Sequence, residues 1–230
     1  LDAGHAAQGY EAMKLLLEDL CLDAGVRVRL HTRLATARVK DGRLTHVLTE
    51  SKSGREAWAA QCFIDCTGDG DLGAAAGCGF EMGHPETGRT QPFSMICLVG
   101  GLRIDQVEPF VTGWTQGDKP PKEKLLAELA RAGVTPSYEW PSLFRVRDDL
   151  FALMANHEYG VSALNADDVT RATLRARAEV HRVVDGLRGL GDCWADARIV
   201  ATAEQIGVRE GRRLHGRYTV TRSDLTQGAR

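Results

Sequence analysis

The sequence predicts an α/β protein, because helix-like and strand-like patterns alternate along its 230 residues. Two observations support this fold class. Near the start, an amphipathic helix pattern at residues 7–24 leads into segments of alternating polar and apolar residues. Further on, a short apolar run at 62–64 leads through a Gly-rich turn into a helix pattern of small residues. The chain is long enough for one large domain or two smaller ones.

The bulk composition is that of an ordinary globular protein. Hydrophobic residues make up 43% and charged residues 26%, which argues against disorder. The formal charge of −2 gives no general attraction to nucleic acid or to an anionic membrane surface. The sequence contains no run of 18 apolar residues and no export signal at its start. We therefore expect no nucleic-acid partner, no membrane segment and a cytoplasmic location.

The cysteines predict no metal centre made by this chain alone. Zinc and iron–sulfur sites usually contain closely spaced Cys pairs, and no C-x-x-C pair occurs here. A disulfide framework is not expected in a chain of this length. The expectation is six reduced thiols: Cys21, Cys62, Cys66, Cys78, Cys97 and Cys193.

The N-terminal third begins with a helix pattern and continues with strand patterns. Apolar residues at three-and-four spacing over residues 7–24 predict a helix that ends at Gly25. The string VRVRLHT at 26–32 alternates as a half-exposed strand does. Two more strand-like runs follow, divided by Asp41-Gly42, a dipeptide typical of hairpin turns.

A strand, a tight turn and a helix are predicted in succession at residues 62–76. This is the geometry on which nucleotide cofactors tend to bind. Residues 68–73, GDGDLG, match the G-x-G-x-x-G pattern literally. However, Asp69 and Asp71 would place two negative charges where a pyrophosphate needs bare N–H groups. We therefore do not interpret this turn as the primary pyrophosphate loop.

The remaining elements are predicted from residue 92 onward. PFSMICLVGG at 92–101 indicates a buried strand. Shorter elements follow it: helices at 105–111 and 122–133, a hairpin at 143–156 turning at Asp148-Asp149, and strand and turn patterns from 197, with a last helix capped at Ser223-Asp224. A long helix is expected at 167–188. Its expected cap and apolar stripe are Asp167 or Asp168, and Leu174, Ala178, His181 and Val184.

The string FIDCTGDGDLGAAAG, at residues 63–77, resembles the second conserved motif of the FAD-dependent oxidoreductase family that is related to fumarate reductases and to heterodisulfide reductase A. Three more strings are similar to segments of that family in the same order: AMKLLLEDLCLDAGVRVRLHT with KSGREAWAAQCFIDCTG, TGRTQPFSMICLVGG, and IGVREGRRLHGRYTVTRSDL. The similarity runs from about residue 8 to residue 226. One departure is Cys66, which stands where Ala is more usual.

The resemblance implies part of a Rossmann-like, three-layer FAD-binding domain with an inserted mixed α+β substrate domain. The implied boundaries are 1–91 for the partial FAD-binding domain, 92–203 for the substrate domain, and 204–230 for a segment returning toward the FAD-binding domain. The family's first Gly-rich loop and final flavin-contacting segment do not occur in this sequence. We therefore expect a fragment that binds FAD weakly and is inactive alone.

The resemblance also implies oxidoreduction of a small organic substrate by flavin-mediated electron or hydride transfer. Two alternatives remain open. One is an electron-transfer subunit of the heterodisulfide reductase A type, in which a 4Fe-4S iron–sulfur cluster would take its cysteines from segments beyond this sequence or from an electron-transfer partner. The other is a non-catalytic protein that kept the flavoprotein fold.

The implied cofactor-binding residues are Thr67, Gly68, Asp69 and Gly70. Glycine permits close approach of the backbone, and a carboxylate can accept a hydrogen bond from a ribose hydroxyl. The alternative is a strand-to-helix turn in which Asp69 or Asp71 only caps the helix.

Arg209 is the candidate catalytic residue, from a cluster with Arg212 and Arg213. A guanidinium can bind an anionic substrate through two hydrogen bonds and can stabilise charge near a reduced flavin. The alternative is a structural ion pair with Glu210. His84 and His157 lie in polar loops and are acid–base candidates, although exposed loop histidines are commonly without such a role.

Overall fold

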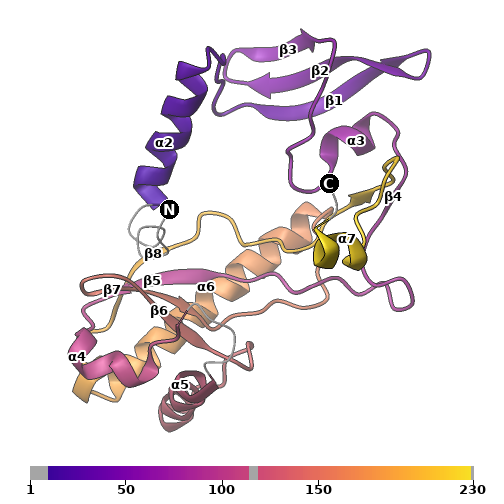
Figure 1. Ribbon diagram of the computed structural model, residues 1–230. Helices are drawn as coiled ribbons and strands as arrows, with labels where there is room; N and C mark the ends of the chain where they lie inside the picture. Colours follow the sequence, from indigo (N-terminus) through magenta and orange to yellow (C-terminus); the bar gives the residue numbers. More distant parts are fainter. Residues whose placement is uncertain (1–9, 114–118, 229–230) are drawn as a thin grey trace. The chain divides into compact units, whose positions relative to one another are not determined.

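The computed structural model describes residues 10–113 and 119–228, and it confirms the mixed α/β class (Figure 1). The chain divides into two compact units. The large unit contains the described residues up to Val28 together with Gln91–Arg209, and the small unit contains Arg29–Thr90 together with Glu210–Arg230. The domain boundaries implied by the sequence, 1–91, 92–203 and 204–230, stay predictions.

The small unit contains a three-stranded antiparallel sheet in the order β1-β2-β3. Its strands are β1 (Arg33–Lys40), β2 (Arg43–Ser51) and β3 (Gly54–Ala59). Asp41 and Gly42 join β1 to β2 with φ angles of 51° and 72°. Positive φ at both central residues is what a two-residue hairpin turn with the twist of the strands requires. The hairpin predicted at Asp41-Gly42 is confirmed.

Three short elements and a C-terminal helix complete the small unit. Helix α3 (Asp71–Ala75) follows the Gly-rich turn, and β4 (Phe80–Glu81) pairs antiparallel with β9 (Arg213–Leu214). This pairing joins segments that lie more than 130 positions apart in the sequence. Helix α7 (Arg222–Gln227) begins after Thr221, whose hydroxyl and the Asp224 carboxylate form a reciprocal capping box. The cap is therefore Thr221 rather than Ser223.

The large unit is built on a four-stranded antiparallel sheet in the order β6-β7-β5-β8. The strands are β5 (Ile96–Gly100), β6 (Ser142–Arg147), β7 (Leu150–Met154) and β8 (Arg198–Thr202). Asp148, with φ of 37°, lies in the turn between β6 and β7 as predicted. In β5 and β7 alternate side chains enter the core, as the period of a strand requires: Cys97 and Val99, and Phe151 and Leu153.

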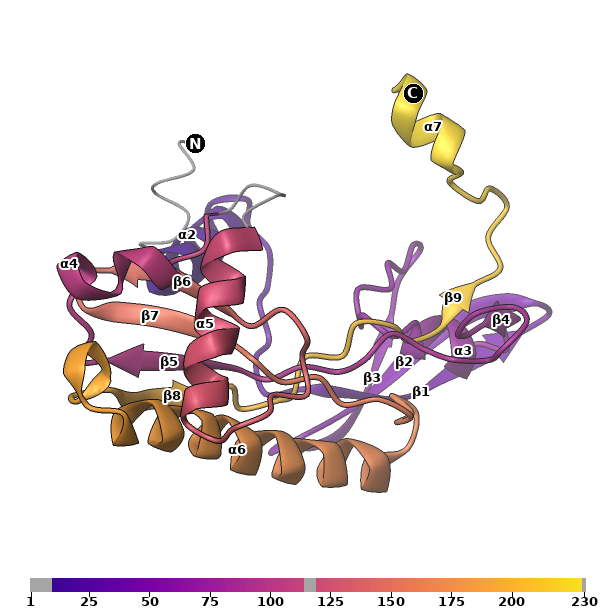
Figure 2. The same ribbon diagram turned by 90° about the horizontal axis from the view of Figure 1, so that it is seen from below.

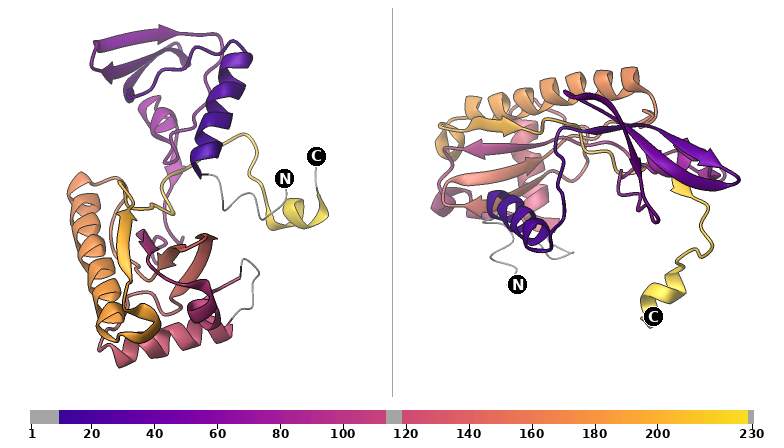
Figure 3. Two further views of the ribbon diagram at one scale, coloured as in Figure 1. Left: turned by 90° about the vertical axis from the view of Figure 1, so that its left-hand side faces the viewer. Right: turned by 90° about the horizontal axis from the view of Figure 1, so that it is seen from above.

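The helical segments of the large unit are α2 (Tyr10–Asp23), α4 (Ile104–Val107), η1 (Glu108–Phe110), α5 (Lys119–Arg131), α6 (Ala166–Gly189) and η2 (Asp192–Trp194). Of these, α5 and α6 pack against the sheet and bury their apolar faces in its core (Figure 2). Helix α6 runs beside β8 and also contacts β5, whereas α5 contacts β6 (Figure 3). Phe151, Leu153, Val180 and Val183 are among the fully buried core residues. None of the described helices is long and apolar enough to cross a membrane.

Two predicted strands are wrong. Residues 26–30 and 62–64 have no regular secondary structure and are not part of any ladder among the described residues. Val28 and Ile64 expose 40% and 81% of their surface. A strand is defined by backbone hydrogen bonds to a neighbour, so an apolar or alternating pattern alone cannot create one. The described part of the chain supplies no neighbour for either segment.

The long helix exists, but its cap and its buried face differ from the prediction. Asn165 is the N-cap, and its side chain accepts hydrogen bonds from the backbone N–H groups of Asp167 and Asp168. Of the predicted stripe, Val184 is buried as expected, but Leu174 is 61% exposed, and Ala178 and His181 are exposed as well. The stripe that enters the core contains small and β-branched residues instead: Ala172, Ala176, Val180, Val183, Val184 and Leu187. Small residues let the helix approach the sheet closely, and the sequence pattern did not reveal this.

Candidate functional site

The turn before α3 presents bare backbone. Gly68 and Gly70 have φ angles of 86° and 65°, in the left-handed region that glycine adopts without steric cost. A Cβ atom at Gly68 would project into open space. Within the part of the chain that the structure describes, the backbone N–H groups of Gly68, Asp69 and Gly70 donate to no acceptor. The turn therefore offers three successive donors to a ligand.

Asp65 organises this turn. One carboxylate oxygen, Oδ1, accepts hydrogen bonds from the Thr67 N–H at 3.0 Å and from the Thr67 hydroxyl at 2.7 Å. The other, Oδ2, accepts from the Gly73 N–H at 2.9 Å. Burial acts to raise the pKa of Asp65, but the hydrogen bonds donated by Thr67 and by backbone N–H groups of α3 together hold that pKa below its ordinary value.

Thr67 completes the network inside the turn. Its hydroxyl oxygen accepts a hydrogen bond from the Asp71 N–H at 2.8 Å while its proton is donated to Asp65. Asp65 and Thr67 thus satisfy the first N–H groups of α3, which have no partner within a helix. Among the described residues, neither Asp69 nor Asp71 provides a side-chain cap. The helix-cap interpretation of these two residues is therefore wrong.

Asp69 lies at the tip of the turn beside the segment that leads into β9. A Cβ atom at Gly211 would lie only 2.0 Å from Asp69 Oδ1, so glycine at position 211 permits this close approach. Burial and the negative charge of Asp71 raise the pKa of Asp69, and the positive charge of Arg212 opposes them. Asp69 therefore takes up a proton more readily than an ordinary Asp.

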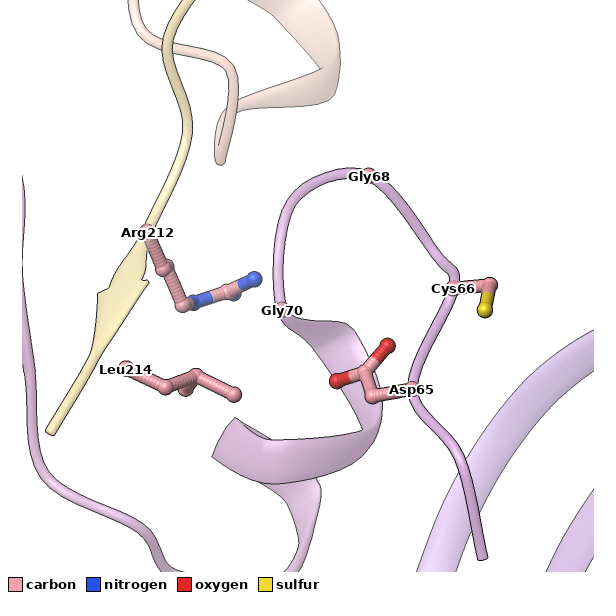
Figure 4. Close-up of a pocket in the computed structure, with 6 residues that line it drawn as sticks. All are labelled: Asp65, Cys66, Gly68, Gly70, Arg212 and Leu214. Atoms are coloured by element: carbon pink, nitrogen blue, oxygen red, sulfur yellow. The ribbon is translucent and has the colours of Figure 1, made fainter. Parts of the chain in front are cut away.

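Arg212 fixes the turn from the β9 side. Its Nη1 donates to the Asp69 carbonyl oxygen at 3.0 Å and to the Asp71 carboxylate at 2.6 Å. Its guanidinium also lies over the Phe80 ring, 5.3 Å from the centroid. Figure 4 shows this guanidinium pointing toward the turn between Gly68 and Gly70. Arg212 therefore has a structural role in the turn, and its positive charge is largely neutralised there.

A pocket of about 400 Å³ opens at the turn, and its lining residues are Asp65, Cys66, Gly68, Gly70, Arg212 and Leu214 (Figure 4). The Cys66 side chain points away from the turn. Leu214 packs closely on α3, because a Cβ atom at Gly73 would lie 2.2 Å from Leu214 Cδ1. The glycines of the GDGDLG string thus serve both the turn and the packing of β9.

Arg209 lies in the large unit. Its Nη2 donates to the Ser94 hydroxyl at 2.8 Å and approaches the Met154 sulfur at 3.9 Å. Ser94 is 7% exposed and is joined to Gly207 by two backbone hydrogen bonds of 3.1 and 2.9 Å. A Cβ atom at Gly207 would lie 3.1 Å from the Ser94 carbonyl oxygen. Glycine at 207 therefore allows the close pairing that brings Arg209 onto Ser94.

The three clustered arginines differ in their partners. Arg212 pairs with Asp71, and Arg213 pairs with Glu210 and donates to the Gly83 carbonyl at 2.7 Å. No carboxylate of the described residues lies within ion-pair distance of the Arg209 guanidinium. The expected alternative, an ion pair that involves Glu210, is formed by Arg213. Arg209 is exposed and keeps donors available for an external anion.

The two candidate histidines have different environments. His84 is exposed, and its Nδ1 accepts a 3.3 Å hydrogen bond from the Glu86 N–H. His157 is half-buried, with Nδ1 3.1 Å from the Tyr159 hydroxyl. Burial and the charge of Arg209 lower the pKa of His157, and Glu179 opposes them. His157 thus lies within the electrostatic range of Arg209, whereas the structure gives His84 a local turn contact.

The model of one protein family matches residues 4–230, almost the whole chain, and that family is described as FAD dependent oxidoreductase. This chain belongs to the FAD dependent oxidoreductase family. Membership supports a flavin-linked redox function and implies that FAD is the cofactor. A search of curated proteins and a search of solved structures found no match.

The described part of this FAD dependent oxidoreductase contains no group of three or more His, Cys, Asp or Glu side chains that could hold a metal ion. Its described cysteines therefore give no support to the iron–sulfur alternative. Cys97 is fully buried, and burial raises its pKa to about 12. This thiol is a packing residue of the core.

Sequence reasoning missed Asp65, Arg212 and Leu214 as residues of the turn. Asp65 had a local signal, because Asp followed two positions later by Thr is typical of an Asx-turn. Arg212 and Leu214 had none. They reach the turn only because β9 pairs with β4, and two-residue strands are too short to be predicted from a pattern.

Proposed function

We propose that this oxidoreductase contacts FAD through the turn Thr67–Gly70 and acts on a small anionic organic substrate that is held by Arg209. The observation that carries the proposal is the row of three available N–H donors at Gly68, Asp69 and Gly70, next to the Asp69 carboxylate. When FAD is bound, its isoalloxazine ring supplies the electron or hydride chemistry. The residues of the chain then have to bind and orient both molecules.

The turn fits the hydroxyl-bearing part of FAD better than the pyrophosphate. N–H groups can donate to hydroxyl oxygens, and the Asp69 carboxylate can accept a hydrogen bond from a hydroxyl. A pyrophosphate would instead meet the negative charges of Asp69 and Asp71, which Arg212 offsets only in part. We therefore assign Gly68, Asp69 and Gly70 to ribose or ribityl hydroxyls. Thr67 contributes by shaping the turn, since its N–H and hydroxyl are both engaged with Asp65.

The environment of Arg209 supports the proposal that the substrate is anionic. An exposed guanidinium that hydrogen-bonds Ser94 but pairs with no described carboxylate can receive a carboxylate by two parallel hydrogen bonds. The charge-neutralised Arg212 and Arg213 are less suited to this role. The positive charge of Arg209 would also stabilise negative charge that develops on the substrate.

The proposal includes the subfamily to which this oxidoreductase belongs. The strings quoted within residues 8–226 support a place near fumarate reductase-related and heterodisulfide reductase A-like flavoproteins. They also support a Rossmann-like, three-layer FAD-binding domain with an inserted substrate domain.

The test is FAD binding by the Asp69→Asn variant. Asn keeps the size of the side chain and one acceptor oxygen but loses the negative charge, so the affinity for FAD should fall about tenfold, as expected when a charge-assisted hydrogen bond becomes a neutral one. The measurement is the dissociation constant for FAD, from the change in flavin fluorescence as protein is added, which also serves when binding is weak.

The matched control is Asp41→Asn, which changes the same chemical group in the exposed β1–β2 turn. This control should bind FAD as the parent does. Equal FAD affinity of the parent and Asp69→Asn would refute the contact between Asp69 and the cofactor.

A further inference from the structure

An exposed tyrosine is oriented by a histidine in the large unit. The Tyr159 hydroxyl lies 3.1 Å from His157 Nδ1, and the two rings meet edge to face with centroids 5.7 Å apart. Tyr159 is 61% exposed. An exposed phenol whose hydroxyl is held by a half-buried imidazole is oriented for an external partner, because its position is fixed from the protein side.

His157 is itself held from two sides. Its ring packs against the Tyr138 ring at a tilt of 39°, with centroids 4.2 Å apart. Its backbone N–H donates to the Ser137 hydroxyl oxygen at 2.7 Å. Ser137 is bound in turn by the buried carboxylate of Glu179 on α6, which accepts from the Ser137 N–H at 2.6 Å and from the Ser137 hydroxyl at 2.8 Å. The backbone of His157 is thus tied to the core helix, and its ring contacts the rings of Tyr138 and Tyr159.

The direction of the His157–Tyr159 hydrogen bond follows from the other ring nitrogen. Nε2 of His157 is buried and has no hydrogen-bond partner among the described residues. An unpaired buried N–H is rarer in proteins than an under-satisfied acceptor, which favours the tautomer with its proton on Nδ1. Burial and Arg209 lower the pKa of His157 against the opposing charge of Glu179, which favours the neutral ring. Nδ1–H then donates to the Tyr159 oxygen and leaves the phenolic proton free for a ligand.

Tyr159 and Arg209 are anchored to consecutive residues. Phe93 exchanges two backbone hydrogen bonds with Glu158, of 3.0 and 2.8 Å. Ser94, the next residue, exchanges two with Gly207 and accepts from the Arg209 guanidinium. Two consecutive residues, Phe93 and Ser94, therefore hold the backbone segments that lead to Tyr159 and to Arg209. The positive charge of Arg209 also lowers the pKa of His157.

We propose that Tyr159 and Arg209 together bind a carboxylate group of the substrate, with His157 and Ser94 as the positioning residues behind them. Arg209 supplies the charge and Tyr159 an oriented neutral donor, a combination that suits a carboxylate. This inference rests on the proposed function, because it assumes that Arg209 is the anion ligand. Beyond the proposed function, it names Tyr159 as a second residue that binds the substrate, and a carboxylate as the substrate group that is bound.

The test is binding of succinate, with its neutral diamide succinamide as the comparison ligand, by isothermal titration calorimetry of the protein in the presence of excess FAD. Tyr159→Phe should weaken succinate binding about tenfold, the effect of one hydrogen bond to a charged acceptor, and leave succinamide binding unchanged. His157→Phe keeps a ring against Tyr138 but removes Nδ1, so it should weaken succinate binding severalfold. His157→Asn should bind succinate more tightly than His157→Phe, because the Asn amide can donate to the Tyr159 hydroxyl. The melting temperatures of the Tyr159 variant and the parent should agree.

The matched control is Tyr218→Phe, which removes the hydroxyl of a similarly exposed tyrosine, at 67%, in the small unit. It should bind succinate as the parent does. Normal succinate binding by Tyr159→Phe together with a large loss in Arg209→Lys would overturn this inference and leave the proposed role of Arg209 standing. Normal binding by Arg209→Lys would remove the proposed role as well. A parent protein that binds no succinate, or an equal loss in Tyr218→Phe, would overturn the carboxylate assignment.

Discussion

Replacing Asp65 by Asn should loosen the Gly-rich turn without removing α3. The Asp65 carboxylate accepts hydrogen bonds through both oxygens, from Thr67 and from the first turn of α3. Asn offers one acceptor oxygen and one NH₂ group, which cannot accept. The variant therefore loses either the Thr67 contacts or the Gly73 contact, together with the negative charge near the N–H groups of the helix.

The expected cost is about 2 kcal/mol, because one hydrogen bond to a charged acceptor is lost and the others lose their charge assistance. That corresponds to about a thirtyfold increase in local opening. The pKa of Asp65 is lowered in the folded state, so its contribution to stability is fully present above the ordinary carboxyl pKa. The contribution is lost as the pH falls through that value toward the folded pKa. The parent and the variant should therefore converge below about pH 4.

Hydrogen exchange of the Gly73 and Asp71 amides is the suitable assay, since these N–H groups donate to Asp65 and Thr67. Both should exchange about thirtyfold faster in Asp65→Asn at pH 7. Asp41→Asn is the control, because Asp41 is exposed and Asn adopts its φ of 51° readily. Unchanged exchange at Gly73 would show that Asp65 does not organise the turn.

Two further predictions concern the large unit. Gly101→Ala should lower the free energy of unfolding in urea by about 3 kcal/mol or more, because its φ is 80° and a Cβ atom would lie 2.1 Å from the Asp196 carbonyl oxygen. Gly133→Ala, with φ of 69° and open space around it, should cost only about 1 kcal/mol, and equal losses would contradict the steric argument. Cys97 should stay unmodified by a thiol reagent such as DTNB in the native protein, whereas the exposed Cys66 should react. Native-state labelling of Cys97 in a mass-spectrometric map would contradict its burial.

Local elements could be predicted where the chemistry lies within a few residues. The Asp41-Gly42 hairpin was predicted because both residues tolerate the positive φ that the turn needs. The turn at Gly68 and Gly70 and the helix after it were predicted for the same reason. The long helix was predicted from its period, but its buried stripe was not, because the small residues Ala172 and Ala176 form that stripe while Leu174 faces solvent.

The sequence by itself determined the α/β class, the family resemblance and the position of the turn that carries Thr67–Gly70, because these depend on the order of residues along the chain. Only the tertiary structure decided what surrounds them. The β4–β9 pairing brings Arg212 to the turn, and the pairing of Ser94 with Gly207 places Arg209 on a buried hydroxyl. Both are contacts between segments more than 100 positions apart, which depend on backbone hydrogen bonds and close packing that no local pattern encodes.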